Sequence, residues 1–268
     1  MQVIKNGSLV CVGTGLKLAG QVSVIARSYL EHADVVFSLM PDGFHQRWVE
    51  GLNPNVVNLQ QFYGRNGEIK NRRITYRQMV AAMLEQVRNG KKVVGAFYGH
   101  PGVFACVPHM AIQQAREEGF EALMEPGISA EACLWADLGI DPGTSGHQSF
   151  EASQFMFFRH VPDPSCHLLL WQIALAGEHT LTQFNTSSDR LQALVEQLQE
   201  WYCPEHEVII YEAANLPVQA PRITRVPLSQ LPWVTLTPAS TLLIPPARKL
   251  EYNMEVLQRL GLTPGDLA

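Results

Sequence analysis

The first 125 residues alternate between short apolar runs and amphipathic stretches. The apolar runs predict buried strands, and they cover residues 8–12, 35–39, 56–59 and 93–97. In the stretches between them apolar residues recur three and four positions apart, which predicts helices around residues 25–33, between Thr75 and Asn89, and over residues 107–118. Strands that alternate with helices imply a mostly parallel sheet covered by helices on both faces.

Pro126 and Gly127 mark the point where this alternation changes. Beyond them the pattern predicts shorter strands at residues 167–174, 208–212 and 241–244, and helices at residues 129–138 and 191–201. Proline-rich connections between these strands favour a second α/β domain with a mixed sheet. We therefore expect an N-terminal domain over residues 1–125, a C-terminal domain over residues 126–250 and a short tail over residues 251–268.

Charged residues are sparse in this chain. Lys and Arg number 20 against 25 Asp and Glu, which gives a net charge of −5, and charged residues make up 17% of the sequence. That share lies below the usual quarter, and a surface poor in charge favours a subunit interface, so we expect an oligomer. The mild acidity argues against a nucleic-acid partner, whose binding site would be basic and clustered.

The sequence predicts no membrane-spanning helix, no signal peptide and no metal site. The longest apolar stretch, residues 168–177, is too short to span a bilayer, and the apolar run near the N-terminus is too short for a signal peptide. The cysteines show no CxxC spacing, and the histidines show no HxH or HExxH ligand pattern. We expect a soluble, cytoplasmic protein without a metal ion.

The glycine pair Gly13 and Gly15 directly follows the first predicted strand. Two close glycines allow a backbone to approach a ligand, as in dinucleotide-binding folds. The next glycine is Gly20, which breaks the GxGxxG spacing, and the second predicted strand ends without an acidic residue that could hold a ribose. A nicotinamide cofactor is therefore disfavoured, and a tight strand-to-helix turn explains the pair equally well.

A second glycine-containing loop follows the strand at residues 93–97. It contains Gly99, Pro101 and Gly102, and it lies at the carboxyl end of a strand, where open α/β sheets bind their ligands. The alternative is a turn around a buried His100. Residues 125–130 form another strand-to-helix turn, in which the side chain of Ser129 can cap the helix.

These motifs together resemble the tetrapyrrole-methylase superfamily of S-adenosylmethionine enzymes, and within it the borosin peptide backbone α-N-methyltransferases. The resemblance covers roughly residues 7–250 and rests on GTG, FYGHPGVF, PGISAE with ADLGIDP, GHQSFEASQ, LWQ, YEAA and the final IPP. It implies a class III methyltransferase fold, in which two α/β domains hold S-adenosylmethionine in the cleft between them, and an interlocked homodimer.

The same resemblance implies which residues hold the cofactor. Several of them would contact it through the backbone, so side-chain identity carries little information there. The residues are Gly13, Gly15, Tyr98, His100, Val103, Ser129, Ala130, Gln172, Ala213, Ser240 and Thr241.

Residues 61–63 and 71–76 resemble the segments that carry the reaction centre in this family. Arg72 and Tyr76 are four apart at a helix start, so they project from one face, and the guanidinium is expected to lower the pKa of Tyr76 below its usual value of about 10. The resemblance makes Tyr76, assisted by Arg72, the candidate base, and Tyr63 and Tyr98 candidate hydrogen-bond donors to the developing oxyanion. From the residues alone, a surface arginine beside a half-buried tyrosine is the alternative.

The sequence departs from the fungal borosins after its IPP motif. Those proteins carry a long C-terminal extension that ends in their own substrate, whereas this chain stops at Ala268 without an apolar run. The resemblance then implies a split, bacterial-type enzyme acting on a separate precursor peptide, and a heterotetramer with that precursor is compatible with it. A methylase of a precorrin-like tetrapyrrole and a non-catalytic binding protein for S-adenosylmethionine or peptide stay as alternatives, but the clustered tyrosines favour a peptide acceptor.

Overall fold

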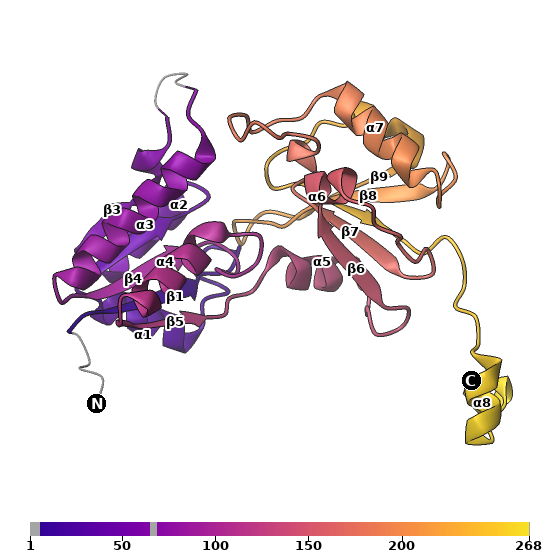
Figure 1. The fold of residues 1–268 in the computed structure, drawn as a ribbon, viewed down its shortest axis with the longest axis horizontal. Coiled ribbons are helices and arrows are strands. Elements are labelled where there is room, and N and C mark those ends of the chain that lie inside the picture. The colour runs from indigo at the N-terminus through magenta and orange to yellow at the C-terminus, as the bar shows by residue number, and fades with distance from the viewer. Residues whose placement is uncertain (1–5, 65–68, 268) are drawn as a thin grey trace.

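The computed structural model describes residues 6–64 and 69–267. Over these residues the chain forms two five-stranded sheets, each with its own helices (Figure 1). The first five residues of the predicted N-terminal domain, the last residue of the predicted tail, and residues 65–68 between Tyr63 and Arg72 lie outside the description. The exact division into domains stays a prediction.

The first sheet is entirely parallel, as the alternating pattern predicts. Its strands β1 (Ser8–Gly13), β2 (Val35–Leu39), β3 (Val56–Asn58), β4 (Lys92–Phe97) and β5 (Glu121–Glu125) lie in the order β3-β2-β4-β1-β5. The helices are α1 (Val24–His32), α2 (Gly43–Leu52), α3 (Arg72–Arg88) and α4 (Cys106–Glu117), with a 3₁₀ turn η1 (Leu59–Phe62) after β3. The pattern missed β5 and α2.

Helices cover both faces of this sheet because its buried strands are apolar on both sides. Leu9 and Cys11 of β1 pack in one cluster with α3 and α4. Val10 and Val12, which alternate with them, pack in another cluster with α1 and α2. The two-sided coverage predicted from the sequence is therefore confirmed.

Helix α3 begins earlier than the sequence pattern predicts. Its N-cap is Asn71, whose side chain accepts a hydrogen bond from the backbone N–H of Arg73. Thr75, the predicted cap, is instead buried inside the helix with 1% of its surface exposed. That prediction was wrong, and the earlier start places Arg72 and Tyr76 on successive turns at the beginning of α3.

The second sheet is mixed, as predicted, because β6 and β7 are parallel and the other pairs are antiparallel. Its strands β6 (His147–Glu151), β7 (His167–Trp171), β8 (Glu207–Glu212), β9 (Arg222–Pro227) and β10 (Thr241–Ile244) lie in the order β6-β7-β10-β8-β9. The helical segments are α5 (Ala130–Leu138), α6 (Ala152–Phe157), η2 (Ile173–Leu175), α7 (Ser188–Leu198) and η3 (Leu228–Trp233). Strand β7 ends before the predicted Ala174 because Gln172 adopts a φ of 55° and starts η2.

Helices again lie on both faces of the second sheet. Leu168 and Leu170 of β7 pack with α6 and α7, while Leu169 and Trp171 pack with α5. Leu16, which follows β1 of the first sheet, joins the cluster on the α5 side. This face of the second sheet therefore lies against a loop of the first sheet.

The chain ends in helix α8 (Met254–Leu260) and a 3₁₀ turn η4 (Pro264–Leu267). Both lie apart from the two sheets at the end of an extended segment (Figure 1). Among the residues that the structure describes, none of the helices is long and apolar enough to cross a membrane.

Candidate active site

Three glycine-containing loops converge at the carboxyl edge of the first sheet. Gly13 follows β1, Gly99 follows β4 and Gly127 follows β5. A Cβ atom on Gly13 would lie 2.5 Å from the carbonyl oxygen of Gly99 and 2.6 Å from the Cα atom of Gly127. Gly15 and Gly99 also exchange backbone hydrogen bonds of 3.2 and 2.8 Å. Close backbone packing therefore explains these glycines, and contact of Gly13 and Gly15 with a cofactor stays a prediction.

The same loops expose several large apolar side chains. Tyr98, Val103 and Ile128 are 48%, 37% and 40% exposed. Phe104 has a φ of 50°, in the left-handed region, and its ring lies 5.3 Å from the ring of Trp171 at the end of β7. Exposed apolar groups on loops between two sheets are typical of a ligand site, because a bound ligand removes them from water.

His100 organises the loop that contains it. Its Nδ1 atom accepts a hydrogen bond of 2.9 Å from the backbone N–H of Gly102. Burial lowers the pKa of His100 below its usual value, which favours the neutral ring that this hydrogen bond requires. The side chain therefore shapes the loop, and its contact with a cofactor stays a prediction.

The predicted cofactor residues of the second sheet lie where β7, β8 and β10 end or begin. Ala130 and Ala213 pack in one cluster with Trp171. Ser240 is buried, donates a hydrogen bond of 2.5 Å to Glu212 and accepts one of 2.9 Å from the backbone of Thr237. Since its hydroxyl group is engaged in this way, a contact from Ser240 to a cofactor would use its backbone. The hydroxyl of Ser129 caps α5, Gln172 directly follows β7, and Thr241 is buried.

On the side of the site where we predict that the methyl acceptor binds, Tyr63 and Tyr76 pack in one cluster with α4. The two phenols lie close enough to shift each other's pKa: Tyr76 raises the pKa of Tyr63, and the Tyr63 hydroxyl lowers that of Tyr76. Tyr98 and Cys106 are close enough to act electrostatically on both. The predicted donation from Tyr63 to an acceptor oxygen stays a prediction.

The pKa of Tyr76 is raised, so the predicted lowering is wrong. Burial is the largest cause and acts upward, and the nearby Cys106 acts in the same direction. The Arg72 guanidinium and the Tyr63 hydroxyl lower the pKa of Tyr76, but burial outweighs them. The sequence correctly predicted that Arg72 lies near Tyr76 and acts to lower its pKa. It could not show how strongly burial raises the pKa of the Tyr76 phenol.

Two residues from the second half of the chain complete this cluster and were missed by the sequence analysis. Glu178 forms an ion pair of 2.9 Å with Arg72, and the Phe184 ring lies 5.2 Å from the Arg72 guanidinium carbon. These contacts span more than 100 positions, so no local pattern indicates them. Cys106, at the start of α4, was also missed as a neighbour of the tyrosines.

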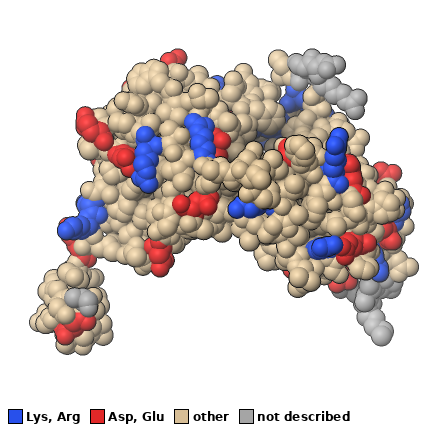
Figure 2. Space-filling model, turned by 180° about the vertical axis from the view of Figure 1, so that it is seen from behind, with Lys and Arg blue, Asp and Glu red and all other residues tan. Residues whose placement is uncertain are grey.

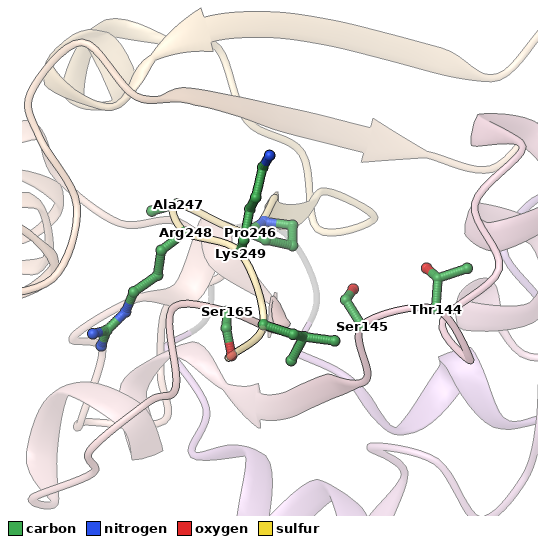
Figure 3. A pocket seen from close by; sticks show the side chains of 8 residues that line it. Thr144, Ser145, Ser165, Pro246, Ala247, Arg248 and Lys249 are labelled. Atoms are coloured by element: carbon green, nitrogen blue, oxygen red, sulfur yellow. The ribbon is translucent and has the colours of Figure 1, made fainter. Parts of the chain in front are cut away.

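A cavity formed by other described residues lies elsewhere. It has a volume of about 520 Å³, and no predicted site residue lines it. Figure 3 shows its lining side chains, which come from the turns before β6 and β7 and from the segment after β10: Thr144, Ser145, Ser165, Pro246, Ala247, Arg248, Lys249 and Leu250. Arg248 and Lys249 point in different directions there, so they form no common binding group (Figure 3).

The chain is similar in sequence to proteins of the family that its motifs resemble. The profile of the tetrapyrrole (corrin/porphyrin) methylases matches residues 8–232. The chain is 40% identical to the methyltransferase and ribosomally synthesized cyclic peptide dendrothelin A precursor of Dendrothele bispora, over 97% of the chain and 63% of that protein. It is 37% identical to a methyltransferase and type I borosin cyclic peptide precursor of Coprinopsis marcescibilis, over 96% of the chain and 68% of that protein.

Solved structures share the fold at low sequence identity. Uroporphyrin-III C-methyltransferase from Thermus thermophilus superposes with a TM-score of 0.62 at 18% identity, over 90% of this chain and 93% of that one. The same enzyme complexed with S-adenosylhomocysteine has a TM-score of 0.60, at 16% identity, over 89% and 92% of the two chains. The predicted tetrapyrrole-methylase fold is confirmed. The chain spans about 63% of the length of the Dendrothele relative.

Proposed function

The chain belongs to the tetrapyrrole (corrin/porphyrin) methylase family, and from that premise we propose that it methylates backbone amide nitrogens of a peptide with S-adenosylmethionine. The observation that carries the proposal is the group of Tyr63, Arg72 and Tyr76 beside Tyr98 and the converging loops. Relatives at 37–40% identity are named as methyltransferases joined to cyclic peptide precursors, which supports a peptide acceptor.

The residues of the converging loops fit S-adenosylmethionine. Tyr98, Val103 and Ile128 offer apolar surface for its adenine and its methionine chain, and the ends of β7, β8 and β10 offer backbone groups for its polar atoms. When bound, the cofactor supplies a methyl group on a sulfonium, which needs no activation by the protein. The protein must therefore activate the acceptor nitrogen.

A peptide nitrogen is a poor nucleophile because its lone pair is delocalised into the carbonyl group. The site must remove the amide proton and stabilise negative charge on the carbonyl oxygen. In our proposal the amide N–H bond breaks, the proton moves to the deprotonated Tyr76 oxygen, and the nitrogen electron pair forms the new bond to the methyl carbon. The bond between that carbon and the sulfonium sulfur would break, with its electron pair left on sulfur, so that S-adenosylhomocysteine departs. The neighbouring Tyr63 hydroxyl favours the deprotonated form of Tyr76, and Arg72 supplies positive charge for the oxygen.

The acceptor is proposed to enter from solution as a separate precursor peptide. What supports this is that Tyr98 and Phe184, which border the acceptor side, are each 48% exposed. The relatives whose names join methyltransferase and precursor in one protein make a tethered acceptor the competing arrangement. Methylation of a peptide added to the purified chain distinguishes the two.

A homodimer is the proposed assembly. Leu250, Tyr252, Met254 and Leu260 near and in α8 are 55–66% exposed, and α8 stands apart from the sheets (Figure 1). Charged side chains are also thinly spread over the face seen in Figure 2. Exposed apolar side chains on a segment that stands apart from the sheets favour a covering surface, and a second copy of the chain would provide one.

The test of the proposed function is mass spectrometry of candidate precursor peptides, encoded beside the gene, after incubation with the protein and S-adenosylmethionine. We expect mass increases of whole methyl groups, absent with the Tyr76→Phe variant. Cofactor binding without transfer to any peptide would favour the non-catalytic binding protein. Transfer to a precorrin-like tetrapyrrole carbon instead would favour the small-molecule methylase.

A further inference from the structure

The start of helix α3 is held by a segment from the second half of the chain, the Glu178 loop (residues 177–184). The backbone N–H of Arg72 donates a hydrogen bond of 2.8 Å to the carbonyl of Leu181. The side-chain amide of Asn71 donates one of 3.0 Å to the carbonyl of Thr180. The Arg72 guanidinium forms its ion pair with Glu178. Backbone and side chain of Arg72 are therefore both fixed by the same loop.

The Glu178 carboxylate is a fixed negative charge. Its side chain is fully buried, and it accepts hydrogen bonds from the backbone N–H groups of Thr180 (2.8 Å) and Leu181 (3.0 Å) and from the Thr180 hydroxyl. Burial alone would raise its pKa, but these hydrogen bonds and Arg72 lower it below the usual value. The group thus stays ionised and cannot turn away without losing several donors.

The backbone of the Glu178 loop is strained at the residue that connects Glu178 with Arg72. Leu181 has a φ of 59°, a left-handed conformation that a branched side chain rarely adopts. Its N–H donates to Glu178 and its carbonyl accepts from Arg72, so the strained residue makes both connections. Strain of this kind persists where the surrounding contacts over-determine it, and it is common at functional sites.

The guanidinium of Arg72 is held in place, and one of its buried N–H donors has no partner among the described residues. Nη2 is paired with Glu178, and the guanidinium carbon lies 5.2 Å from the Phe184 ring, which itself packs against Tyr63 at 5.9 Å. The Arg72 side chain is 8% exposed, and its Nε–H is buried without a hydrogen-bond partner among the described residues. A buried donor without a partner is unfavourable, and a carbonyl oxygen entering the site would satisfy it.

We propose that Glu178 is a positioning residue: its carboxylate orients Arg72 so that the free Nε–H is presented to the carbonyl oxygen of the acceptor amide. The inference rests on the proposed function, because it assumes an amide acceptor beside Tyr76. It adds that a loop of the second half of the chain sets the geometry of an acceptor site built mainly on the first sheet.

The carboxylate also offsets the charge of Arg72. The titratable and charged groups that face Tyr76 are Tyr63 at the end of η1, Tyr98 after β4, Cys106 at the start of α4, and Arg72 on its own helix. When Glu178 loses its charge, no negative charge offsets the positive charge of the Arg72 guanidinium near Tyr76. The pKa of the Tyr76 phenol then decreases.

The test compares Glu178→Gln with the unchanged protein. The substitution keeps the size of the side chain and removes its charge. We expect the methylation rate at saturating peptide to fall by about 10–100-fold, as is typical when a catalytic group loses its orientation. Affinity for S-adenosylhomocysteine, measured by calorimetry, should not change. The Tyr76 phenol, followed by NMR with ¹³C-labelled tyrosine and assigned with Tyr76→Phe, should titrate at lower pH.

Two variants control the experiment. Glu118 forms an ion pair of 2.5 Å with Arg88, the last residue of α3, which lies at the end of the helix away from the acceptor site. Glu118→Gln removes the charge from that pair and should leave the methylation rate and the Tyr76 titration unchanged. Glu178→Asp keeps the charge but shortens the side chain, so the Tyr76 titration should stay while the rate falls.

An unchanged rate or an unchanged Tyr76 titration in folded Glu178→Gln would overturn the inference. If the unchanged protein methylates no peptide, the proposed function fails, whereas the titration still shows whether Glu178 acts on Tyr76 through Arg72. The two failures are therefore distinguishable.

Discussion

Replacing Tyr76 by Phe removes one hydroxyl group from the centre of the proposed mechanism. The ring packs partly buried in the main cluster of the first sheet, and Phe preserves that packing. The loss for folding is the polar interaction with the neighbouring Tyr63, worth at most about 1 kcal/mol. The loss for catalysis is the general base, worth about 10²–10⁴ in rate. At 1.36 kcal/mol per decade this is about 3–5 kcal/mol, well above the folding effect.

The assay measures initial methylation rates by mass spectrometry over a range of pH, with cofactor affinity measured in parallel. Because the pKa of Tyr76 is raised above its usual value, the deprotonated fraction grows about tenfold per pH unit through the neutral range. The rate of the unchanged protein should rise accordingly, and the residual rate of Tyr76→Phe should not. Cofactor affinity should be unchanged, because Tyr76 lies on α3 and not on the converging loops.

Arg72→Ala provides an internal check. If Arg72 and Tyr76 act as one unit, the double variant should lose far less than the product of the single losses. Near-normal methylation by Tyr76→Phe would refute the assignment of the base. Positioning and carbonyl polarisation by Arg72 would then remain as the explanation of catalysis.

The other predictions concern the cofactor loops and the assembly. Gly13→Ala places a Cβ against backbone atoms of Gly99 and Gly127, so it should destabilise the fold by about 1–3 kcal/mol and weaken S-adenosylhomocysteine binding, as thermal melting and calorimetry would show. Calorimetry should also find S-adenosylhomocysteine bound more tightly than NAD, and the reverse order would contradict the cofactor assignment. Sedimentation at micromolar concentration should show a dimer, and removal of residues 250–268 should weaken it; a fully active monomer would exclude the proposed assembly.

The sequence predicted the elements whose apolar periodicity is strong. The all-apolar core of β1 and the Met79 and Met83 stripe of α3 are examples. Helix α2 was missed because its buried face includes His45 and Gln46, and β5 because it begins and ends in glutamate. The true start of α3 depended on whether Asn71 or Thr75 provides the cap, which local preference does not decide.

The candidate site also has a part that the sequence predicted and a part that it could not predict. A spacing of four residues on a helix was enough to place Arg72 and Tyr76 on one face. Their electrostatics depend on burial and on Glu178, a partner 106 positions away from Arg72, so the direction of the Tyr76 pKa shift could not be predicted. Long-range packing of this kind leaves no trace in local sequence patterns.

The most direct test of backbone methylation uses S-adenosylmethionine labelled with ¹³C in its methyl group. After incubation with a precursor peptide, fragmentation in the mass spectrometer and NMR of the product locate the label. We predict that the labelled carbon is bonded to backbone nitrogen atoms of the peptide. Label on side chains only, on a carbon atom of another acceptor, or on no product at all would contradict the account.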